Sequence, residues 1–218
     1  MVRMSSTPSP QIDSRAVLWS AKASELAERP LLVLLHGVGS NEGDLFSLSP
    51  HLPLSPVIAS LRAFTPYGQG FSWYELGTPG DPKSEGVDAA ALAVLAWLEG
   101  LDPAPKNVGL LGFSQGAAVA MQTLRHAPDR FDFVVQLSGY VTGGEAPGDD
   151  ELTRLRPDVF WGRGTEDEVI PPRAIQHTEQ WLPEHSTLDA RIYESLPHAV
   201  SQAELSDIGA FIRRHYDA

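Results

Sequence analysis

Hydrophobic and polar residues follow two alternating patterns along this chain. Short runs that are apolar almost throughout lie at residues 31–35 (LLVLL), 107–113 (NVGLLGF) and 131–137 (FDFVVQL). Runs of this kind are typical of the central strands of a parallel sheet, because helices cover both faces of such strands. Weaker candidate strands lie at 159–161 and 190–193, and residues 16–19 favour an antiparallel strand at the edge of the sheet.

The segments between these runs carry the spacing of amphipathic helices. Within residues 87–98, apolar residues recur at i, i+3, i+4 and i+7, which indicates one buried stripe. Ser201 and Glu204 form a candidate capping box, in which each side chain bonds the backbone N–H of the other, at the start of a last helix. Further helices are predicted over residues 116–126 and from residue 171 to about residue 183.

Strands and helices alternate to the end of the chain. This order predicts the α/β class, with a mostly parallel central sheet and helices on both faces. The 218 residues fit one domain of this kind, which we expect to span residues 14–218, after a flexible Ser- and Pro-rich lead-in at 1–13. Sites in such sheets lie beyond the carboxyl ends of the strands, so the loops that follow the strands are the place to look for chemistry.

The composition narrows the classes of function. The chain carries 28 acidic against 16 basic residues, a net charge of −12, whereas nucleic acids and anionic membranes bind clustered Lys and Arg. It has no cysteine, which excludes thiol nucleophiles, disulfides and thiolate metal sites. Its longest apolar run, residues 89–98, is shorter than the ~20 residues that span a bilayer, and the N-terminus has no apolar signal-peptide core. We therefore expect a cytoplasmic protein that acts on a small molecule, with no nucleic-acid partner and no membrane span.

A nucleophile motif follows the second apolar run. Gly112-Phe113-Ser114-Gln115-Gly116 matches G-x-S-x-G and lies between a predicted strand and an Ala-rich helix, which is the setting of a nucleophile elbow. The turn is so tight that a Cβ at either glycine would press against a neighbouring element. Ser114 then lies at a helix N-terminus, where the helix dipole favours developing negative charge. We predict that Ser114 is a nucleophile.

A serine hydroxyl needs a base to take its proton and a carboxylate to hold that base. His198 follows the strand predicted at 190–193 and precedes the last helix, so it reaches the same edge of the sheet as Ser114 and is the predicted base. The other six histidines precede Ser114, lie in or beside helices, or fall at the opposite edge. Three carboxylates compete for the acid in the loop after residue 161: Glu166, Asp167 and Glu168.

Attack on a carbonyl also needs N–H groups that receive the charge on its oxygen. The backbone N–H of Gln115, directly after the nucleophile, is one predicted donor. The second is expected in the loop after residues 31–35, where glycines flank Val38 and let its N–H turn inward; Gly37 is the alternative donor. For the side chain of His36 in the same loop we expect a structural hydrogen bond.

With these residues identified, the chain resembles the phospholipase/carboxylesterase family of α/β-hydrolases, which includes acyl-protein thioesterases and small bacterial carboxylesterases. The family pattern G-x-x-D-x-x-(I/V)-P maps onto residues 164–171 and assigns the acid to Asp167. The resemblance implies the α/β-hydrolase fold without a large cap domain, a Ser-His-Asp triad and no cofactor or metal. The segments that carry it are LLHGVGSNEGDL (34–45), FSWYEL (71–76), GLLGFSQGAAVA (109–120), QLSGY (136–140), GRGTEDEVIP (162–171) and PHAVS (197–201).

Candidate substrate-binding residues are Phe71, Trp73 and Tyr74, in a loop after a predicted strand ending near Thr65, and Leu45. Their apolar surfaces suit an acyl pocket, although the aromatic rings could equally serve only to pack the loop. The chain has no long insertion that would form a lid, since residues 140–157 are the only sizeable stretch without periodicity. We therefore expect an open site that accepts short to medium acyl chains.

The predicted function is a serine carboxylesterase that works through an acyl-enzyme. An acyl thioesterase or lysophospholipase of the same fold is the nearest alternative, and a peptidase or amidase would keep the triad and change the leaving group. A catalytically inactive ligand-binding protein of the same fold is the non-enzyme alternative, because a fold does not dictate a function. The sequence leaves monomer and homodimer both open.

Overall fold

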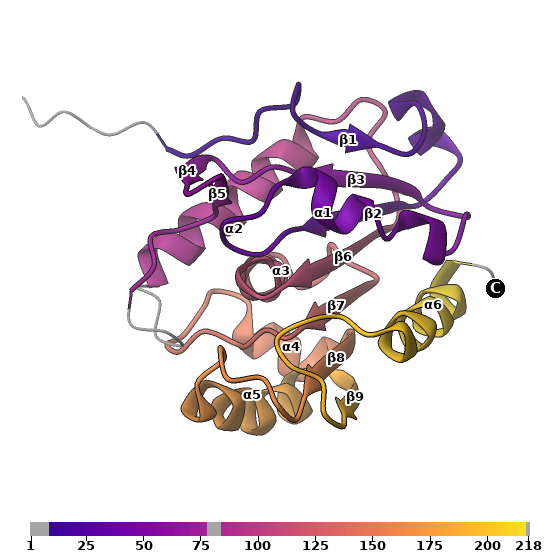
Figure 1. Ribbon diagram of the computed structural model, residues 1–218. Coiled ribbons are helices and arrows are strands. Elements are labelled where there is room, and N and C mark those ends of the chain that lie inside the picture. The colour runs from indigo at the N-terminus through magenta and orange to yellow at the C-terminus, as the bar shows by residue number, and fades with distance from the viewer. Residues whose placement is uncertain (1–8, 78–83, 217–218) are drawn as a thin grey trace, which may run out of the picture.

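The computed structural model describes residues 9–77 and 84–216. Within these residues seven strands form one sheet, in the order β1-β3-β2-β6-β7-β8-β9, and every neighbouring pair is parallel except β1 with β3 (Figure 1). The mostly parallel sheet and its antiparallel edge strand are confirmed. The strands are β1 (Leu18–Trp19), β2 (Leu31–Leu35), β3 (Val57–Leu61), β6 (Val108–Phe113), β7 (Phe133–Leu137), β8 (Asp158–Gly164) and β9 (Thr187–Tyr193).

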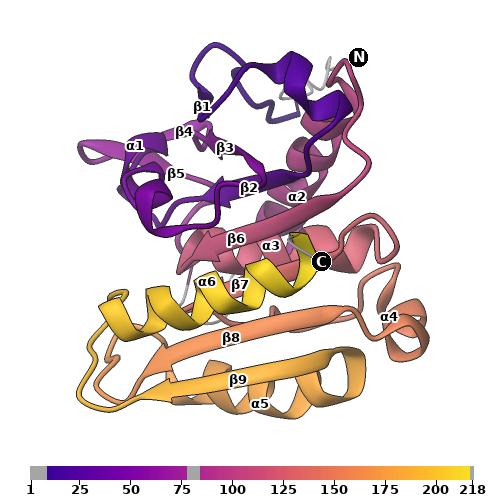
Figure 2. The ribbon, with the colours of Figure 1, turned by 90° about the vertical axis from the view of Figure 1, so that its right-hand side faces the viewer.

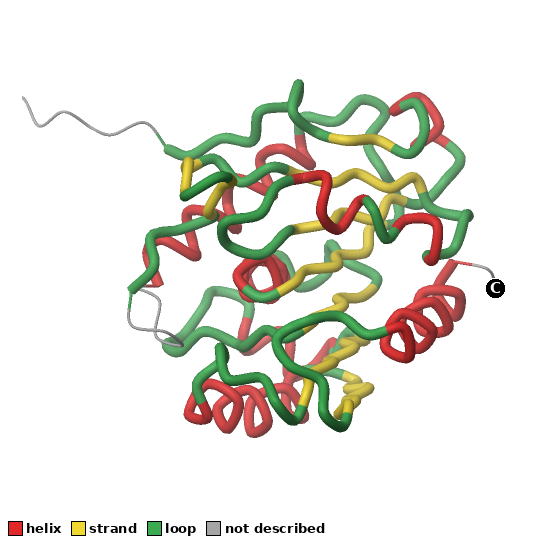
Figure 3. The backbone as a smooth tube through the Cα atoms, in the orientation of Figure 1, coloured by secondary structure: helices red, strands yellow, loops and turns green. Residues whose placement is uncertain are grey.

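Helices cover both faces of the sheet, as predicted (Figures 1, 2 and 3). α2 (Ser84–Glu99), α3 (Gln115–His126) and α5 (Pro172–His185) lie on one face. The opposite face carries α6 (Gln202–Tyr216) and the short α1 (Glu42–Phe46). Two 3₁₀ turns, Ala23–Ala27 and Ser49–His51, connect strands at the N-terminal half. No helix in the described ranges is long and apolar enough to cross a membrane.

The alternation of side chains along each strand divides the core into two layers. In β2, Val33 and Leu35 join the cluster beneath α2 and α3, whereas Leu32 and Leu34 join the cluster beneath α6. All five residues of this strand are fully buried. Each such side chain contributes about 1.5–3 kcal/mol by leaving water, so a run that is apolar throughout is what a strand covered on both faces requires.

The prediction of a strand that ends near Thr65 is wrong. β3 already ends at Leu61, and Thr65 begins a separate hairpin of β4 (Thr65–Tyr67) and β5 (Gly70–Ser72). The hairpin is held by the loop after β2: the N–H of Gly39 donates to the Phe71 carbonyl at 2.8 Å, and the N–H of Phe71 donates to the Ser40 carbonyl at 2.8 Å. A Cβ at Gly70 would lie 2.3 Å from the Gly39 carbonyl oxygen, so the close approach of the two segments needs glycine there.

The stretch predicted to lack periodicity contains a short helix, α4 (Asp149–Leu155), which packs beside α5. Buried Arg125 of α3 holds its start. The guanidinium donates to both carboxylate oxygens of Asp149 at 2.7 and 2.6 Å and to the carbonyls of Thr142 and Gly144. A long-range ion pair, rather than local periodicity, therefore orders this segment.

The start of α6 confirms the predicted capping box. The N–H of Glu204 donates to the Ser201 hydroxyl at 3.1 Å, and the N–H of Ser201 donates to Glu204 Oε2 at 3.4 Å. Glu204 is fully buried, and its other oxygen lies against β8, since a Cβ at Gly162 would come within 2.1 Å of it.

The two ends of the domain differ in how they are covered. Of the lead-in expected over residues 1–13, residues 1–8 lie outside the described part of the chain, and Ile12 packs against the core.

At the other side of the sheet, β9 is an edge strand with mostly exposed or half-exposed side chains. The carboxylate of Asp189 on this strand pairs with Arg191 at 2.7 Å and with Arg214 of α6 at 3.0 Å.

Candidate active site

Ser114 lies in the turn between β6 and α3, at the carboxyl edge of the sheet. Its backbone has φ 54° and ψ −116°, a sparsely populated conformation that costs a non-glycine residue about 1–3 kcal/mol. The surrounding structure enforces it. A Cβ at Gly112 would lie 2.4 Å from the Gly116 carbonyl oxygen, and one at Gly116 would lie 2.0 Å from the Leu35 carbonyl oxygen. Both glycines have the steric role that the sequence predicts.

Three residues far apart in the sequence meet above this turn. His198, in the loop after β9, has Nε2 2.9 Å from Ser114 Oγ. Its Nδ1 lies 2.7 Å from Oδ2 of Asp167, in the loop after β8. Because a carboxylate only accepts hydrogen bonds, this contact assigns the proton to Nδ1 and leaves the lone pair of Nε2 facing the serine hydroxyl.

Asp167 is the carboxylate that reaches the imidazole, and its side chain is 2% exposed. Its second oxygen accepts the backbone N–H groups of Val169 at 2.9 Å and Ile170 at 3.2 Å, which fixes the orientation of the carboxylate. Glu166 and Glu168 are exposed on either side of it. The alternation along the loop therefore turns one acid inward and two outward.

The loop after β2 brings Val38 to the same place. Among the described residues, no hydrogen bond occupies the backbone N–H of Val38 or that of Gln115, and both residues line one cavity with Ser114. The conformation of this loop depends on His36, which is fully buried. Its Nδ1 bonds the Gly37 carbonyl at 2.7 Å, and its Nε2 accepts the N–H of Ala63 at 3.1 Å. Burial lowers the pKa of His36 below its ordinary value of 6.5, which keeps the ring neutral and suited to both bonds.

The side chain of Gln115 holds the segment after β5 against the elbow. Its Oε1 accepts the N–H of Trp73 at 2.8 Å, and its Nε2 donates to the Tyr74 carbonyl at 2.9 Å. The indole N–H of Trp73 in turn donates to the His36 carbonyl at 2.8 Å. Gln115 thus links the elbow to an aromatic segment, Trp73 and Tyr74, and through Trp73 to the loop of Val38.

A small, mostly apolar cavity of about 80 Å³ opens beside Ser114. Of the four residues predicted to bind substrate, Tyr74 lines it. Trp73 is fully buried and packs on His36, and Leu45 belongs to the core cluster beneath α6. Phe71 is half-buried, with the guanidinium of Arg62 4.7 Å from its ring centre. The cavity is lined by Val38, Tyr74, Leu76, Ser114, Gln115, Tyr140, Val169, Ile170 and Pro171.

Several of these lining residues were not singled out from the sequence. Val169, Ile170 and Pro171 directly follow Asp167, so the loop that supplies the acid also builds a wall of the cavity. Tyr140 follows β7, the strand next to the elbow strand. Tyr140 could have been identified from the sequence, because it directly follows a central strand within the segment QLSGY.

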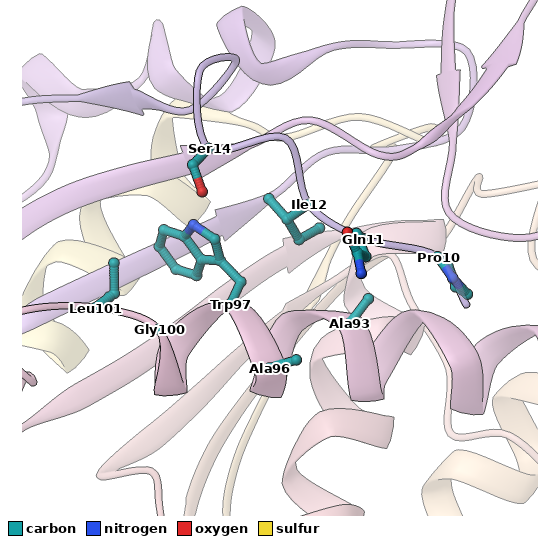
Figure 4. A pocket seen from close by; sticks show the side chains of 9 residues that line it. All are labelled: Pro10, Gln11, Ile12, Ser14, Ala93, Ala96, Trp97, Gly100 and Leu101. Carbon is teal, nitrogen blue, oxygen red and sulfur yellow. The ribbon is translucent and has the colours of Figure 1, made fainter. Parts of the chain in front are cut away.

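A larger cavity of about 290 Å³ lies elsewhere, between the N-terminal segment and α2 (Figure 4). In it the side chain of Ser14 points toward the indole of Trp97, which rises from α2, and Ile12 also lines the cavity. Its lining comes from residues 10–14 and 93–101 and includes no residue of the Ser114 site. The larger of these two cavities is therefore not the one that contains the candidate active site.

The chain is similar to known proteins in both sequence and fold. A family model described as phospholipase/carboxylesterase matches residues 20–216. Acyl-protein thioesterase 1 of Kluyveromyces lactis is 23% identical over 207 residues, 84% of this chain and 91% of that protein. Carboxylesterase SOBER1 of Arabidopsis thaliana is 27% identical over 217 residues, 85% of this chain and 88% of that protein. The solved structure of a carboxylesterase from Mesorhizobium loti superposes with a TM-score of 0.76 at 20% identity, covering 94% of this chain and 99% of that one. That likeness shows a shared fold and confirms the α/β-hydrolase architecture.

Proposed function

We infer, since this chain belongs to the phospholipase/carboxylesterase family, that it hydrolyses carboxylic esters through an acyl-enzyme formed on Ser114. The observation that carries the proposal is the chain of two contacts from Ser114 Oγ to His198 Nε2, at 2.9 Å, and from His198 Nδ1 to Asp167, at 2.7 Å. A nucleophile, a base within hydrogen-bond reach and a group that orients the base are the parts that covalent acyl transfer requires.

In the first half of the proposed reaction, Ser114 Oγ attacks the ester carbonyl carbon while His198 Nε2 takes the hydroxyl proton. The imidazolium that forms is stabilised by the carboxylate of Asp167, which keeps its own charge. The carbonyl oxygen becomes an oxyanion that accepts the N–H groups of Val38 and Gln115; a donor of this kind typically contributes a factor of about 10²–10³ in rate. The tetrahedral intermediate collapses, the C–O bond to the alcohol breaks, and His198 gives its proton to the leaving oxygen.

In the second half, water replaces the alcohol. His198 Nε2 takes a proton from the water as its oxygen attacks the acyl carbon, the same two N–H groups receive the second oxyanion, and the proton returns to Ser114 Oγ as the acid leaves. The His198 ring lies 4.9 Å, centre to centre, from the ring of Phe113, the residue before the nucleophile, and this contact helps to hold the imidazole in place. The same base thus serves both halves without a cofactor.

The cavity beside Ser114 supports a short to medium acyl group as substrate. Its lining is mostly apolar, and its volume of about 80 Å³ is well below the roughly 300 Å³ at the lower end of common ligand pockets. We propose Tyr74 as a direct contact of the acyl group.

Substitution of the nucleophile tests the proposal. Ser114→Ala and His198→Ala are each expected to lower kcat for p-nitrophenyl acetate and butyrate by about 10⁴-fold or more, because the triad acts as a unit. Ser24→Ala and His51→Ala change exposed residues of the same types and should retain full activity. A wild-type rate in either of the first two variants would contradict the proposed mechanism.

A fluorophosphonate probe separates the enzyme from a catalytically inactive ligand-binding protein. Such probes bond covalently to an activated serine, so labelling is expected in the wild type and absent in Ser114→Ala. Thioesters belong in the same assay, since relatives named acyl-protein thioesterases share the family. A thioester hydrolysed faster than the oxygen ester of the same acyl chain would assign the protein to the thioesterase alternative.

A further inference from the structure

Two tyrosines from distant parts of the chain meet at the inner side of the cavity. Tyr74 follows β5 and Tyr140 follows β7, yet their hydroxyl oxygens lie 3.0 Å apart and share a hydrogen bond. The two residues are 5% and 7% exposed. By contrast, Leu76 and Val169, which line the same cavity, are 49% and 55% exposed. The cavity therefore has an open side of aliphatic residues and a closed side formed by the two phenol rings.

The backbone of Tyr74, which carries the first ring, is held by the side chains of Gln115 and Ser72. The Tyr74 carbonyl accepts bonds from Gln115 Nε2 at 2.9 Å and from the Ser72 hydroxyl at 2.5 Å. Behind it, α2 approaches so closely that a Cβ at Gly86 would lie 3.1 Å from Tyr74 Cβ. Tyr74 therefore has little room to move away from an entering chain.

The second ring is held by α5. Tyr140 packs in a small apolar cluster with Ala118, Ile170 and Ala174. The next residue, Val141, donates its N–H to the Thr178 hydroxyl of α5 at 2.9 Å. The two rings are thus anchored to different elements, and the hydroxyl bond joins those anchors.

The bond between the rings persists over the working range of pH. Burial raises the pKa of Tyr74 well above its ordinary value of 10, so its hydroxyl stays protonated. Breaking a hydrogen bond between two buried hydroxyls is costly, which makes opening the pair unfavourable. The closed side behaves as a fixed wall.

We propose that the Tyr74–Tyr140 pair is the end wall of the acyl pocket and sets the upper limit on acyl length. The volume of about 80 Å³ is small beside the roughly 300 Å³ at the lower end of common ligand pockets, so the cavity suits a short acyl chain. Longer acyl groups must bend outward across Leu76 and Val169. This inference rests on the proposed function and adds the determinant of its substrate class.

The test compares esters of graded acyl length in wild type, Tyr140→Ala and Tyr140→Phe. In wild type, kcat/KM for p-nitrophenyl esters is expected to be highest at short chains and to fall at octanoate and decanoate. Tyr140→Ala removes a ring from the wall, so the ratio of kcat/KM for octanoate to that for butyrate should rise by about tenfold or more, since each additional buried methylene contributes about fourfold in binding. Tyr140→Phe keeps the ring and should retain the wild-type preference for short chains.

Failure of the inference and failure of the proposed function give different results. If wild type hydrolyses decanoate as well as butyrate, or if a folded Tyr140→Ala that still reacts with fluorophosphonate keeps the wild-type profile, the end-wall assignment is overturned although the esterase remains. If wild type hydrolyses no ester and takes no fluorophosphonate label, the proposed function itself fails. Tyr140→Leu serves in the same comparison if the alanine variant does not fold, and the wild-type chain-length profile alone decides if neither does.

Discussion

Gln115 illustrates how much one residue beside the proposed nucleophile contributes. Its backbone N–H makes no hydrogen bond among the described residues, and its side chain bonds Trp73 and Tyr74. Loss of the side chain leaves the buried N–H of Trp73 without this bond, whereas the Tyr74 carbonyl keeps the bond from the Ser72 hydroxyl. A buried group of this kind costs about 1–3 kcal/mol when it is left unsatisfied. The same residue thus supports both the geometry of the elbow and the stability of the aromatic segment.

Gln115→Ala is therefore expected to lower both activity and stability. A displacement of about 1 Å near a reacting centre can cost about 10²-fold in rate, so we expect kcat/KM for p-nitrophenyl butyrate to fall by about that factor. The free energy of unfolding, measured by urea denaturation, should fall by about 2 kcal/mol. Gln202→Ala, at the exposed first residue of α6, is the matched control and should change neither quantity. Wild-type kinetics in Gln115→Ala would show that the bonds of its side chain do not support the site.

At the level of single residues, the sequence identifies some positions and misses others for physical reasons. Ser114 could be located because the elbow is a local motif, and His198 because its place after a strand brings it to one edge of the sheet. Tyr140 could not be paired with Tyr74, since their contact depends on how α2 and α5 position two separate segments. The catalytic roles assigned from the sequence stay predictions until the variants above are measured.

The helix α6 carries a buried acid in its first turn, and this element links stability to pH. Burial raises the pKa of Glu204 from its ordinary value of 4.5 to about 7. Between these two values the folded protein keeps a proton that the unfolded chain has released. The free energy of unfolding therefore falls as pH rises through this window, by up to about 1.4 kcal/mol per pH unit from this group.

Glu204→Gln is expected to remove that contribution. Glutamine can still accept the N–H of Ser201, so the capping bond is retained while the titration is lost. Urea denaturation at steps between pH 4.5 and 7.5 should show a smaller decrease in stability with rising pH than in wild type. Glu194→Gln, an exposed acid in the loop before α6, should leave the wild-type slope unchanged. If the free energy of unfolding falls equally steeply with pH in Glu204→Gln and in wild type, this explanation is wrong.

Elements whose stability is local are the ones that the sequence predicts well. β2 and β6 are apolar throughout because both of their faces are covered, and their pattern shows it. The β4–β5 hairpin has three residues in each strand and is held by Gly39 and Ser40 of another loop. Nothing in residues 65–72 alone indicates those bonds, so this hairpin could not be distinguished from the end of a longer strand.

On the scale of the whole molecule, Arg125 connects elements on one face of the sheet. It lies in the last turn of α3, is 1% exposed, and bonds the segment after β7 and the start of α4. Its guanidinium carbon also lies 5.2 Å from the ring centre of Trp181 on α5. One buried cation thus satisfies groups from three other parts of the fold.

Arg125→Met is expected to destabilise the entire domain. Removing one partner of a buried ion pair costs about 3–5 kcal/mol, which in a chain of this size lowers Tm by roughly 6–20 °C. Differential scanning calorimetry measures the shift directly. Arg154→Met, which changes an exposed arginine of α4, is the control and should lower Tm by less than about 2 °C. Equal Tm values for the two variants would show that the Arg125 network adds little to global stability.

The edge strand β9 has a consequence for the behaviour of the protein at high concentration. In the described part of the chain no strand pairs with its outer side, so alternate residues of β9 present unpaired backbone groups there. Ile192 adds an exposed apolar side chain, a combination that invites a strand from another molecule. Asp189, Arg191 and Arg214 place a cluster of ionic groups along that border. An approaching β-strand would have to strip water from these charges, so the border discourages intermolecular sheet growth and the fibrillar deposits that follow from it.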